Sequence, residues 1–447
     1  MGSAGPPAMT VPIRFGDSAD PILQLAQRSY RDHEAAAHSL AAAKLTIVRE
    51  YDVAGMDRAA TICHWGRSGS VLLASFFDSH DDIITLPNQT SEFAYPFFLE
   101  YPSLSVWEKL IAYPAYSEIK KGNAGNFFLK NNPDGNFAIE AADYFASVEA
   151  LFALYRDRPA GELNARPRFF QFLHVAYAGA LAKPAVNPRP LMISAQHWIN
   201  ESLAQAFVAD FPDARFLHTI RDPISAFDSW LERHFIWQFK DNTDLFSGYR
   251  YPVFDAVRDL LAWDSGHRGM EARTRAVRFE DMHLTPAETM RRLAEWLGVP
   301  YHPSMIESTL NGNPYVVEGS GQSWIGSNPQ SARRRSKNLN ALDRLLVFAL
   351  LHRNFMAWKY PSPGVLRSVW LRASVIAIGC LIPSKMEIVN VRNILRLQAL
   401  PALRAGRYRF ALRAPIVLLV RRLRMIWLIL AAAGPRLVGT KQPMQAI

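Results

Sequence analysis

Residues 61–80 constrain the fold of this chain more than any other stretch, because they predict a short buried strand, a tight glycine turn and a helix. Gly66 and Gly69 lack a Cβ atom, so the backbone can bend there and approach a ligand closely. Amides at the start of the helix, together with its dipole, favour an anion such as a phosphate. These amides belong to Ser68, Gly69, Ser70 and Val71. Arg67 adds a fixed positive charge, and the segment therefore predicts an anion-binding loop.

This loop differs from the nucleotide-binding loop of ATPases, which has the pattern G-x-x-x-x-G-K-[ST]. That pattern places a lysine on the β- and γ-phosphates and a hydroxyl on magnesium. In this chain the glycines stand closer together, and Arg67 precedes the second one. We therefore expect the bound phosphate to be the 5′-end of a nucleotide that needs no metal. Packing of small residues in a strand-to-helix turn is the alternative interpretation.

A second strand-to-helix segment follows at residues 211–230. Arg215–Ile220 is rich in strand-forming residues, and Pro223 occupies a position typical of a helix start. Arg221 would lie at the strand end and Ser229 about two turns into the helix. Both side chains could reach one anion. The alternative is that Arg221 pairs with Asp222 or with another nearby carboxylate.

Together the two segments resemble the sulfotransferases that use 3′-phosphoadenosine-5′-phosphosulfate (PAPS). A third match is Val277–Met282, followed by a helix-like stretch that ends in Leu297–Gly298. The three blocks occur in the family's order, within residues 58–360. The resemblance implies an α/β three-layer sandwich with a central parallel sheet, the P-loop-like sulfotransferase fold. It also implies that the first loop cradles the 5′-phosphosulfate and that Arg221 and Ser229 hold the 3′-phosphate.

Sulfuryl transfer needs a held donor, a base for the acceptor hydroxyl, and positive charge at the bridging oxygen. The resemblance assigns the positive charge to Arg67. Two residues are candidates for the base. His197 lies just past a predicted strand, where cytosolic members of the family carry a histidine. Glu92 follows the first helix, where tyrosine- and sugar-modifying relatives carry a glutamate. A structural, hydrogen-bonded role is the alternative for each.

The chain also departs from the family pattern at three places. Phe279 replaces a tyrosine whose hydroxyl often contacts the adenine. Ser194 stands roughly where the family has a lysine at a strand end. The late basic loop has a loose counterpart in Gly319–Gly326 and in Arg333–Arg335, although we expect these arginines to form a solvated helix start. These departures keep open a noncatalytic protein of the same fold.

The composition fits one large α/β unit with appendages, since 49% of the 447 residues are hydrophobic. We expect an N-terminal leader and helix in residues 1–57, with the helix outside the core, a sulfotransferase domain in 58–360, and a basic helical tail in 361–447. The two cysteines provide neither a disulfide framework nor a metal cluster, so we expect a reducing compartment and no metal. No secretory signal is recognised at the N-terminus, which favours the cytoplasm.

The tail is strongly basic. It holds 14 Lys and Arg residues against one acid, Glu387, a net charge of +13, so the rest of the chain carries −3 of the total +10. Its apolar stretches, 365–382 and 410–434, are interrupted by arginines, which are costly inside a bilayer. We therefore predict amphipathic helices at an anionic membrane surface, peripheral at the cytoplasmic face, rather than a span. Packing on the domain or on a partner subunit is the alternative.

These patterns together predict transfer of a sulfuryl group from PAPS, without a metal, to a hydroxyl or amine. The acceptor is expected to be a glycan, a lipid or a small molecule, and no nucleic acid is expected as a partner. A P-loop nucleotide kinase or NTPase is the main rival, disfavoured by the missing Lys-[Ser/Thr] pair. A noncatalytic, membrane-associated protein of the same fold is the third interpretation.

Overall fold

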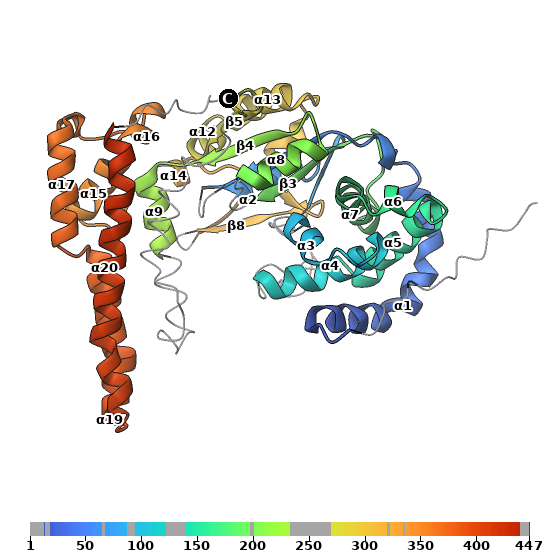
Figure 1. The fold of residues 1–447 in the computed structure, drawn as a ribbon. Coiled ribbons are helices and arrows are strands. Elements are labelled where there is room, and N and C mark those ends of the chain that lie inside the picture. Colours follow the sequence, from blue (N-terminus) through green and yellow to red (C-terminus); the bar gives the residue numbers. More distant parts are fainter. Residues whose placement is uncertain are drawn as a thin grey trace, which may run out of the picture.

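The protein is built around a five-stranded parallel sheet with the strand order β2-β3-β1-β4-β5 (Figure 1). The computed structural model describes residues 13, 18–64, 68–86, 94–121, 139–196, 201–232, 270–319, 322–333, 336–438 and 447. The strands are β1 (Ala59–Cys63), β2 (Ile83–Thr85), β3 (Leu191–Gln196), β4 (Arg215–Ile220) and β5 (Thr274–Arg278). All five residues of β1 are buried, as expected for the central strand of a parallel sheet.

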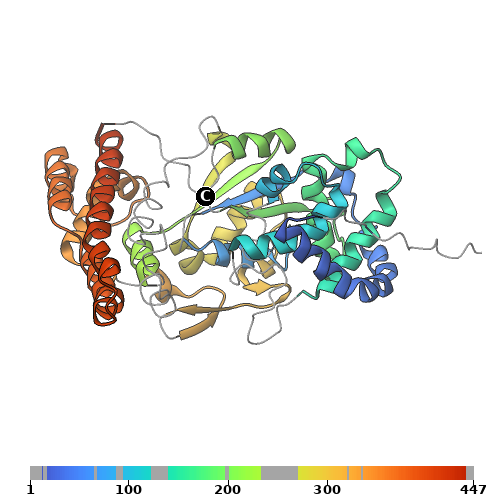
Figure 2. The ribbon, with the colours of Figure 1, turned by 60° about the horizontal axis from the view of Figure 1, so that its bottom comes forward.

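Helices cover both faces of the sheet, so the fold is the predicted three-layer α/β sandwich (Figures 1 and 2). Ala60 and Ile62 pack with helices on one face: α2 (Ser70–Phe77), α12 (Phe279–Leu284) and α13 (Pro286–Leu297). Ala59 and Cys63 point to the other face and its larger core. The helices of that core are α1 (Pro21–Val48), α3 (Ala94–Glu100), α4 (Val106–Lys121), α5 (Ala141–Tyr155), α6 (Ala160–Leu163), α7 (Arg166–Ala180) and α8 (Glu201–Asp210).

Helix α1 differs from its expected position outside the core. It begins after Asp20, whose carboxylate accepts the amide hydrogens of Ile22 and Leu23, and it continues to Val48. Leu23, Ala26 and further apolar residues on one side of it are buried in the same core as α5 and α7. The hydroxyl of Tyr30 donates a 2.7 Å hydrogen bond to Glu149 on α5. The first helix thus closes the larger core.

The second motif folds as its sequence predicts. Strand β4 ends at Ile220, and α9 (Pro223–Leu231) begins directly after Asp222. The side chain of Asp222 accepts hydrogen bonds from the amides of Ile224 and Ser225. It is thus an N-cap that satisfies free N–H groups in the first turn of the helix. In the third motif, α13 ends at Leu297, and Gly298 caps it in the left-handed conformation with φ +69°.

Short elements connect the sheet to the C-terminal part. Two antiparallel pairs come first, β6 (Thr309–Leu310) with β7 (Asn313–Pro314), and β8 (Val316–Gly319) with β9 (Gln322–Ile325). Helices α14 (Pro329–Ala332), α15 (Ala341–Leu350) and α16 (His352–Ala357) follow. The prediction that Arg333 begins a helix is wrong, because Asn328 caps the start of α14 and Arg333 stands at its end. Arg334 and Arg335 lie outside the described residues.

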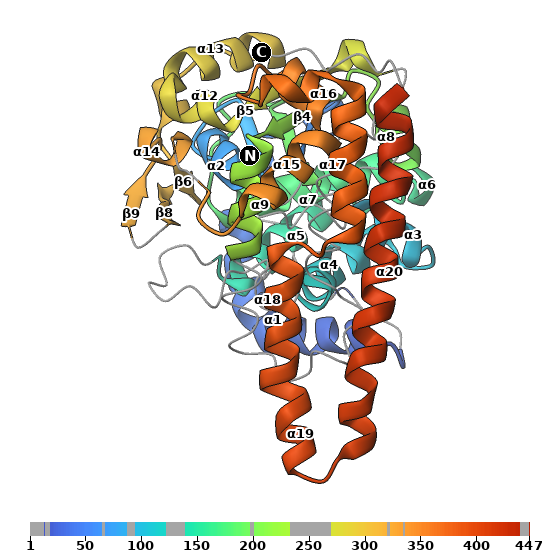
Figure 3. The same cartoon turned by 90° about the vertical axis from the view of Figure 1, so that its left-hand side faces the viewer.

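The tail folds into helices, as predicted, and lies beside the rest of the molecule (Figure 1), with a long hairpin that projects beyond it (Figure 3). Its helices are α17 (Val369–Leu381), α18 (Lys385–Ile394), a π-helical turn (Leu395–Ala399), α19 (Leu400–Arg404) and α20 (Tyr408–Val438). Helix α20 continues through Pro415. Within the described part of the chain, no helix is both long enough and apolar enough to cross a membrane.

Candidate active site at the ends of β1 and β4

The sheet itself selects a place for a ligand. Strand β1 pairs with β3 on one side and with β4 on the other. The chain leaves β1 toward β2, and it leaves β4 toward β5 at the opposite edge. In open parallel sheets, ligands bind beyond the carboxyl ends of two neighbouring strands whose connections diverge in this way. The loops after β1 and β4 are the two that carry the predicted anion-binding residues.

A buried hydrogen bond connects these two loops. The hydroxyl of Ser68, in the turn after β1, lies 2.7 Å from the hydroxyl of Thr219 near the end of β4. Both side chains are buried. Because a hydroxyl can donate and accept at once, this pair satisfies two polar groups in an apolar setting and fixes the spacing of the loops.

Gly69 occupies a position that other residues rarely adopt. Its φ is +97°, and it stands at the N-cap of α2 without a side-chain hydrogen bond to the first turn. A Cβ atom built on Gly69 would lie 2.5 Å from Cδ2 of Phe279. The ring of Phe279 therefore packs directly on the glycine turn. This close packing and the positive φ explain the need for glycine.

Phe279 also supports the guanidinium of Arg221. The Arg221 Cζ atom lies 4.1 Å from the centre of the Phe279 ring, a cation–π contact, and Arg221 is only 6% exposed. Residue 279 thus contacts both loops, on one side Gly69 and on the other Arg221. The contact gives Phe279 a structural role that does not depend on the hydroxyl of the family's tyrosine.

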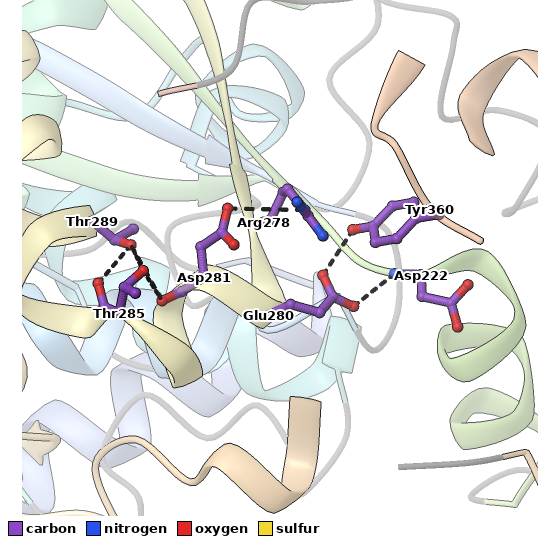
Figure 4. A network of polar contacts seen from close by, with 7 residues as sticks. All are labelled: Asp222, Arg278, Glu280, Asp281, Thr285, Thr289 and Tyr360. Atoms are coloured by element: carbon purple, nitrogen blue, oxygen red, sulfur yellow. Dashed lines mark hydrogen bonds and ion pairs between the residues drawn. The ribbon is translucent and has the colours of Figure 1, made fainter. Parts of the chain in front are cut away.

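A carboxylate on α12 holds the turn that follows Arg221 (Figure 4). Glu280 accepts the backbone amide hydrogen of Asp222 at 2.9 Å and the hydroxyl hydrogen of Tyr360 at 2.8 Å. Burial raises the pKa of Glu280, and the hydrogen bond from Asp222 opposes this rise. The Cζ atom of Arg278 lies 4.8 Å from the centre of the Tyr360 ring, and its Nε atom lies 3.9 Å from Oδ2 of Asp281. The ends of β4 and β5 are therefore connected to each other and to residue 360.

Ser229 lies on α9, two turns from its start, and is buried. Its neighbour Asp228 is also buried and accepts hydrogen bonds from the Ser336 hydroxyl at 2.8 Å and the Asn338 amide at 2.7 Å. These bonds hold α9 against the segment that precedes α15. Arg221 and Ser229 are thus positioned by two separate sets of contacts, one at each end of α9.

The site has a neutral histidine beside it. His283 on α12 is buried, and its ring lies 4.3 Å from that of Phe279. Its Nδ1 atom accepts the amide hydrogen of Asn328 at 2.8 Å. Burial lowers the pKa of His283 to about 4, and the positive charge of Arg221 contributes to the change. The imidazole is therefore uncharged at neutral pH.

The predicted site residues fall into two groups. Ser68, Gly69, Ser70 and Val71 form the turn and first residues of α2, and Arg221 and Ser229 flank the start and the second turn of α9. Gly66, Arg67, Glu92 and His197 lie outside the described residues. Ser194 is buried in the middle of β3, which continues to Gln196, and its hydroxyl has no hydrogen-bond partner within the described part of the chain. No cluster of three or more metal-ligating side chains occurs among the described residues.

Four supporting residues were not predicted as part of the site: Thr219, Glu280, Asp228 and Tyr360. Each acts through a partner far away in the sequence, such as Ser68, which is 151 residues from Thr219. The sequence offered a partial signal for Glu280, since it follows the predicted strand end next to Phe279. Nothing local distinguishes the others from ordinary core or surface residues.

The contact of Gly69 with Phe279 makes Gly69→Ala a sharp test of the turn. We expect a loss of about 1–3 kcal/mol for the backbone strain and a similar further loss for the steric overlap with the ring. Gly312→Ala is a matched control, because Gly312 has φ +75° but a Cβ added there would meet no atom of the described residues within 4 Å. Thermal unfolding of both variants gives the comparison. Equal losses of stability in the two would show that the overlap with Phe279 is absent.

The lowered pKa of His283 predicts a pH dependence of stability. Between pH 6.5 and about 4 the unfolded chain binds a proton at this residue that the folded chain does not, so the free energy of unfolding decreases as the pH falls. His283→Gln retains an acceptor for the Asn328 amide and removes the titration. Between pH 7 and 4 the original protein should lose up to about 3 kcal/mol more than this variant, measured by urea unfolding. If the free energies of unfolding of the two proteins changed in parallel with pH, the lowered pKa of His283 would be contradicted.

The sequence pattern of the sulfotransferase family matches residues 62–303. Among solved structures, the chain is similar to the sulfotransferase domain from the Synechococcus PCC 7002 olefin synthase, with 17% identity, a TM-score of 0.36, and coverage of 68% of this chain and 96% of that chain. The sulfotransferase domain from the curacin biosynthetic pathway is 14% identical, with a TM-score of 0.32, and the match covers 72% of this chain and 97% of that chain. Sulfotransferase STF9 from Mycobacterium avium is 16% identical, with a TM-score of 0.28, and the match covers 64% of this chain and 75% of that chain. No curated protein matches the chain significantly.

The family pattern includes the turn at Ser68–Gly69, the Arg221 segment and α13, and it covers more than half of the 447 residues. The chain therefore belongs to the sulfotransferase family.

Proposed function

We propose that residues 58–360 form a transferase unit that moves a sulfuryl group from PAPS to a hydroxyl or amine, without a metal. The observation that carries the proposal is the hydrogen bond between Ser68 and Thr219. It brings the glycine turn before α2 close to the end of β4, which precedes the Arg221 segment. One ligand with phosphates at its two ends would bridge these loops, as 3′-phosphoadenosine-5′-phosphosulfate does by its chemistry.

The donor would be held at two points. At the first, the amides of Gly69, Ser70 and Val71 face the 5′-phosphosulfate at the positive end of α2. At the second, Arg221 and Ser229 bind the 3′-phosphate, with the guanidinium pre-positioned by the Phe279 ring. A planar guanidinium whose orientation is fixed before binding loses less entropy when it pairs with a phosphate.

In the transfer step, the acceptor oxygen or nitrogen attacks sulfur, and the bond from sulfur to the bridging phosphate oxygen breaks. The leaving group is 3′-phosphoadenosine-5′-phosphate, whose terminal oxygen takes on negative charge. Arg67 would stabilise this charge, and the acceptor proton would pass to His197 or to Glu92. These three residues are assigned from the sequence and the family resemblance.

The rival functions differ in their chemistry. A kinase or NTPase needs groups for a triphosphate with its magnesium, and the loop after β1 lacks the Lys-[Ser/Thr] pair that supplies them. A noncatalytic protein of the same fold would bind the nucleotide but transfer nothing. We favour the transferase because the pattern of the sulfotransferase family matches residues 62–303. The Phe279 ring beneath Arg221 and the bond of Glu280 to the next amide hold this segment in place.

The acceptor is proposed at the level of class, as a glycan, a lipid or a small molecule. A cytoplasmic location is part of the same proposal. Screening fractions of each class with labelled donor would identify the acceptor, because transfer moves the label from the nucleotide to the product.

Arg221→Ala should selectively weaken recognition of the 3′-phosphate. Loss of a charge-assisted hydrogen bond costs about 1.5–3 kcal/mol, so the affinity for 3′-phosphoadenosine-5′-phosphate should fall about ten- to a hundredfold. Affinity for adenosine 5′-phosphosulfate, which has no 3′-phosphate, should change little. Ser229→Ala should show the same selectivity with a smaller loss. Calorimetric titration measures the affinities of the original protein and of both variants for the two ligands.

Arg215→Ala is the matched control for Arg221→Ala. Arg215 is a partly buried arginine at the start of β4, whereas Arg221 follows the end of this strand, and the Arg215 guanidinium lies 5.5 Å from the centre of the Trp296 ring. Its removal should leave both affinities unchanged. Equal losses with Arg215→Ala and Arg221→Ala, or equal losses for both ligands, would contradict the placement of the 3′-phosphate.

Single-turnover transfer separates the two candidate bases. With saturating donor, His197→Ala should slow transfer by about a hundred- to ten-thousandfold and leave donor affinity nearly unchanged, because a general base acts on the acceptor. Glu92→Ala, with the same donor and acceptor, is the comparison. Near-normal transfer by His197→Ala with collapse in Glu92→Ala would move the base to Glu92. Arg67→Ala should weaken both donor binding and transfer.

A further inference from the structure

The C-terminal hairpin projects beyond the rest of the molecule (Figure 3). One arm consists of α18, the π-helical turn and α19, and the other arm is α20. The arms meet at a turn around Gly406, which has φ +73°. The hairpin lies outside residues 62–303, which match the family pattern, so it is an addition to the transferase fold.

The base of the hairpin is built into the molecule. Met425, Ile429 and Ala433 of α20 are buried against residues of α15 and α17. Arg422 bonds Glu387 of α18 at 2.7 Å and donates to the carbonyls of Gly379 and Cys380. The charge of Arg422 is therefore used internally. These contacts hold α20 in one orientation and determine which of its faces remains outside.

The outward face of α20 is apolar. Its exposed large side chains recur at three- and four-residue spacing, so they form one stripe along the helix. The stripe consists of Ile416, Leu419, Val420, Leu423, Trp427 and Leu430. Each of them is more than half exposed, and Trp427 is 66% exposed. Soluble monomers rarely leave a continuous apolar surface of this length uncovered.

Positive charge accompanies this stripe. Arg404, Arg407, Arg409 and Arg413 are exposed around the tip, and Arg424 is exposed beside the stripe. The tail from residue 361 carries +13. A second copy of the chain would bring two such tails together, and their like charges would repel. The surface is therefore complementary to a partner that is apolar and anionic at once.

We propose that this hairpin docks on the surface of an anionic lipid bilayer, with the α20 stripe at the boundary between headgroups and acyl chains. Arginines bind lipid phosphates, while Trp427 and the aliphatic residues enter the interface. Arg421 and Arg424 lie in the middle of α20, where they would be costly in the hydrocarbon core, so the helix lies along the surface. The proposal does not depend on the sulfuryl-transfer chemistry proposed above.

Co-sedimentation of the full chain with vesicles tests this proposal. The protein should bind vesicles of phosphatidylcholine mixed with phosphatidylglycerol, bind pure phosphatidylcholine far less, and be released as salt is raised. The tip variant, Arg404→Glu with Arg407→Glu and Arg409→Glu, should bind at least about a hundredfold more weakly. The stripe variant, Leu419→Ser with Leu423→Ser and Trp427→Ser, should lose about tenfold or more. All six positions are exposed, so both variants should unfold at the same temperature as the original protein.

The matched control is Arg28→Glu with Arg31→Glu and Arg49→Glu, which changes the net charge by the same amount. All three positions are exposed; Arg28 and Arg31 lie on α1, and Arg49 follows its last residue. This variant should bind the mixed vesicles as the original protein does. Equal loss in the control and the tip variant would overturn the proposal, because binding would then reflect net charge alone. So would equal binding to both kinds of vesicle. A dimer in sedimentation velocity that the stripe variant abolishes, without vesicle binding by the original protein, would assign the stripe to a second copy instead.

Discussion

The parallel pairing of β1 with β4 is the constraint on which the candidate site depends. The pairing places Ile62 opposite Leu217 and Cys63 opposite His218, so the two strands end at the same edge of the sheet. The segments that follow them therefore both begin at this edge. The bond between Ser68 and Thr219 closes the gap between the loops, and the Phe279 ring fills the space between Gly69 and Arg221. The start of α2 and the buried guanidinium of Arg221 lie near each other because both strands end at this edge.

Several polar side chains near Arg221 are buried, so each depends on its hydrogen-bond partners. Glu280 is buried with two hydrogen-bond donors, Asp222 and Tyr360, and His283 is buried in its neutral form. A buried polar group that loses its partner costs about 1–3 kcal/mol, so these contacts permit few alternative positions of the Arg221 segment. Tyr360 also directly precedes the basic tail segment, residues 361–447. The anchoring of the hairpin and the positioning of Arg221 therefore use neighbouring parts of the chain.

The sequence predicted those features that local chemistry determines. The strand before Arg221 and the helix start at Pro223 are confirmed, because strand-forming residues and a proline after an aspartate leave little choice. The predicted position of α1 outside the core was wrong. Its burial depends on the facing surfaces of α5 and α7, which cannot be recognised in the sequence. Glu280 and Asp228 were missed for the same reason. Their partners lie 58 and 108 residues away, and such distances can be read only from the folded chain. In the tail, the apolar residues of α20 belong to two faces, and only the packing against α15 and α17 separates the buried face from the exposed stripe.

Calorimetric titration of the unmodified protein with two nucleotides tests the central claim most directly. One nucleotide is 3′-phosphoadenosine-5′-phosphate without magnesium, and the other is ATP with magnesium. The two proposed phosphate-binding points, at Gly69–Val71 and at Arg221 with Ser229, predict tight binding of the first nucleotide. The missing Lys-[Ser/Thr] pair predicts weak binding of the second. Preference for ATP with magnesium would contradict the account and would favour a nucleotide kinase or NTPase instead.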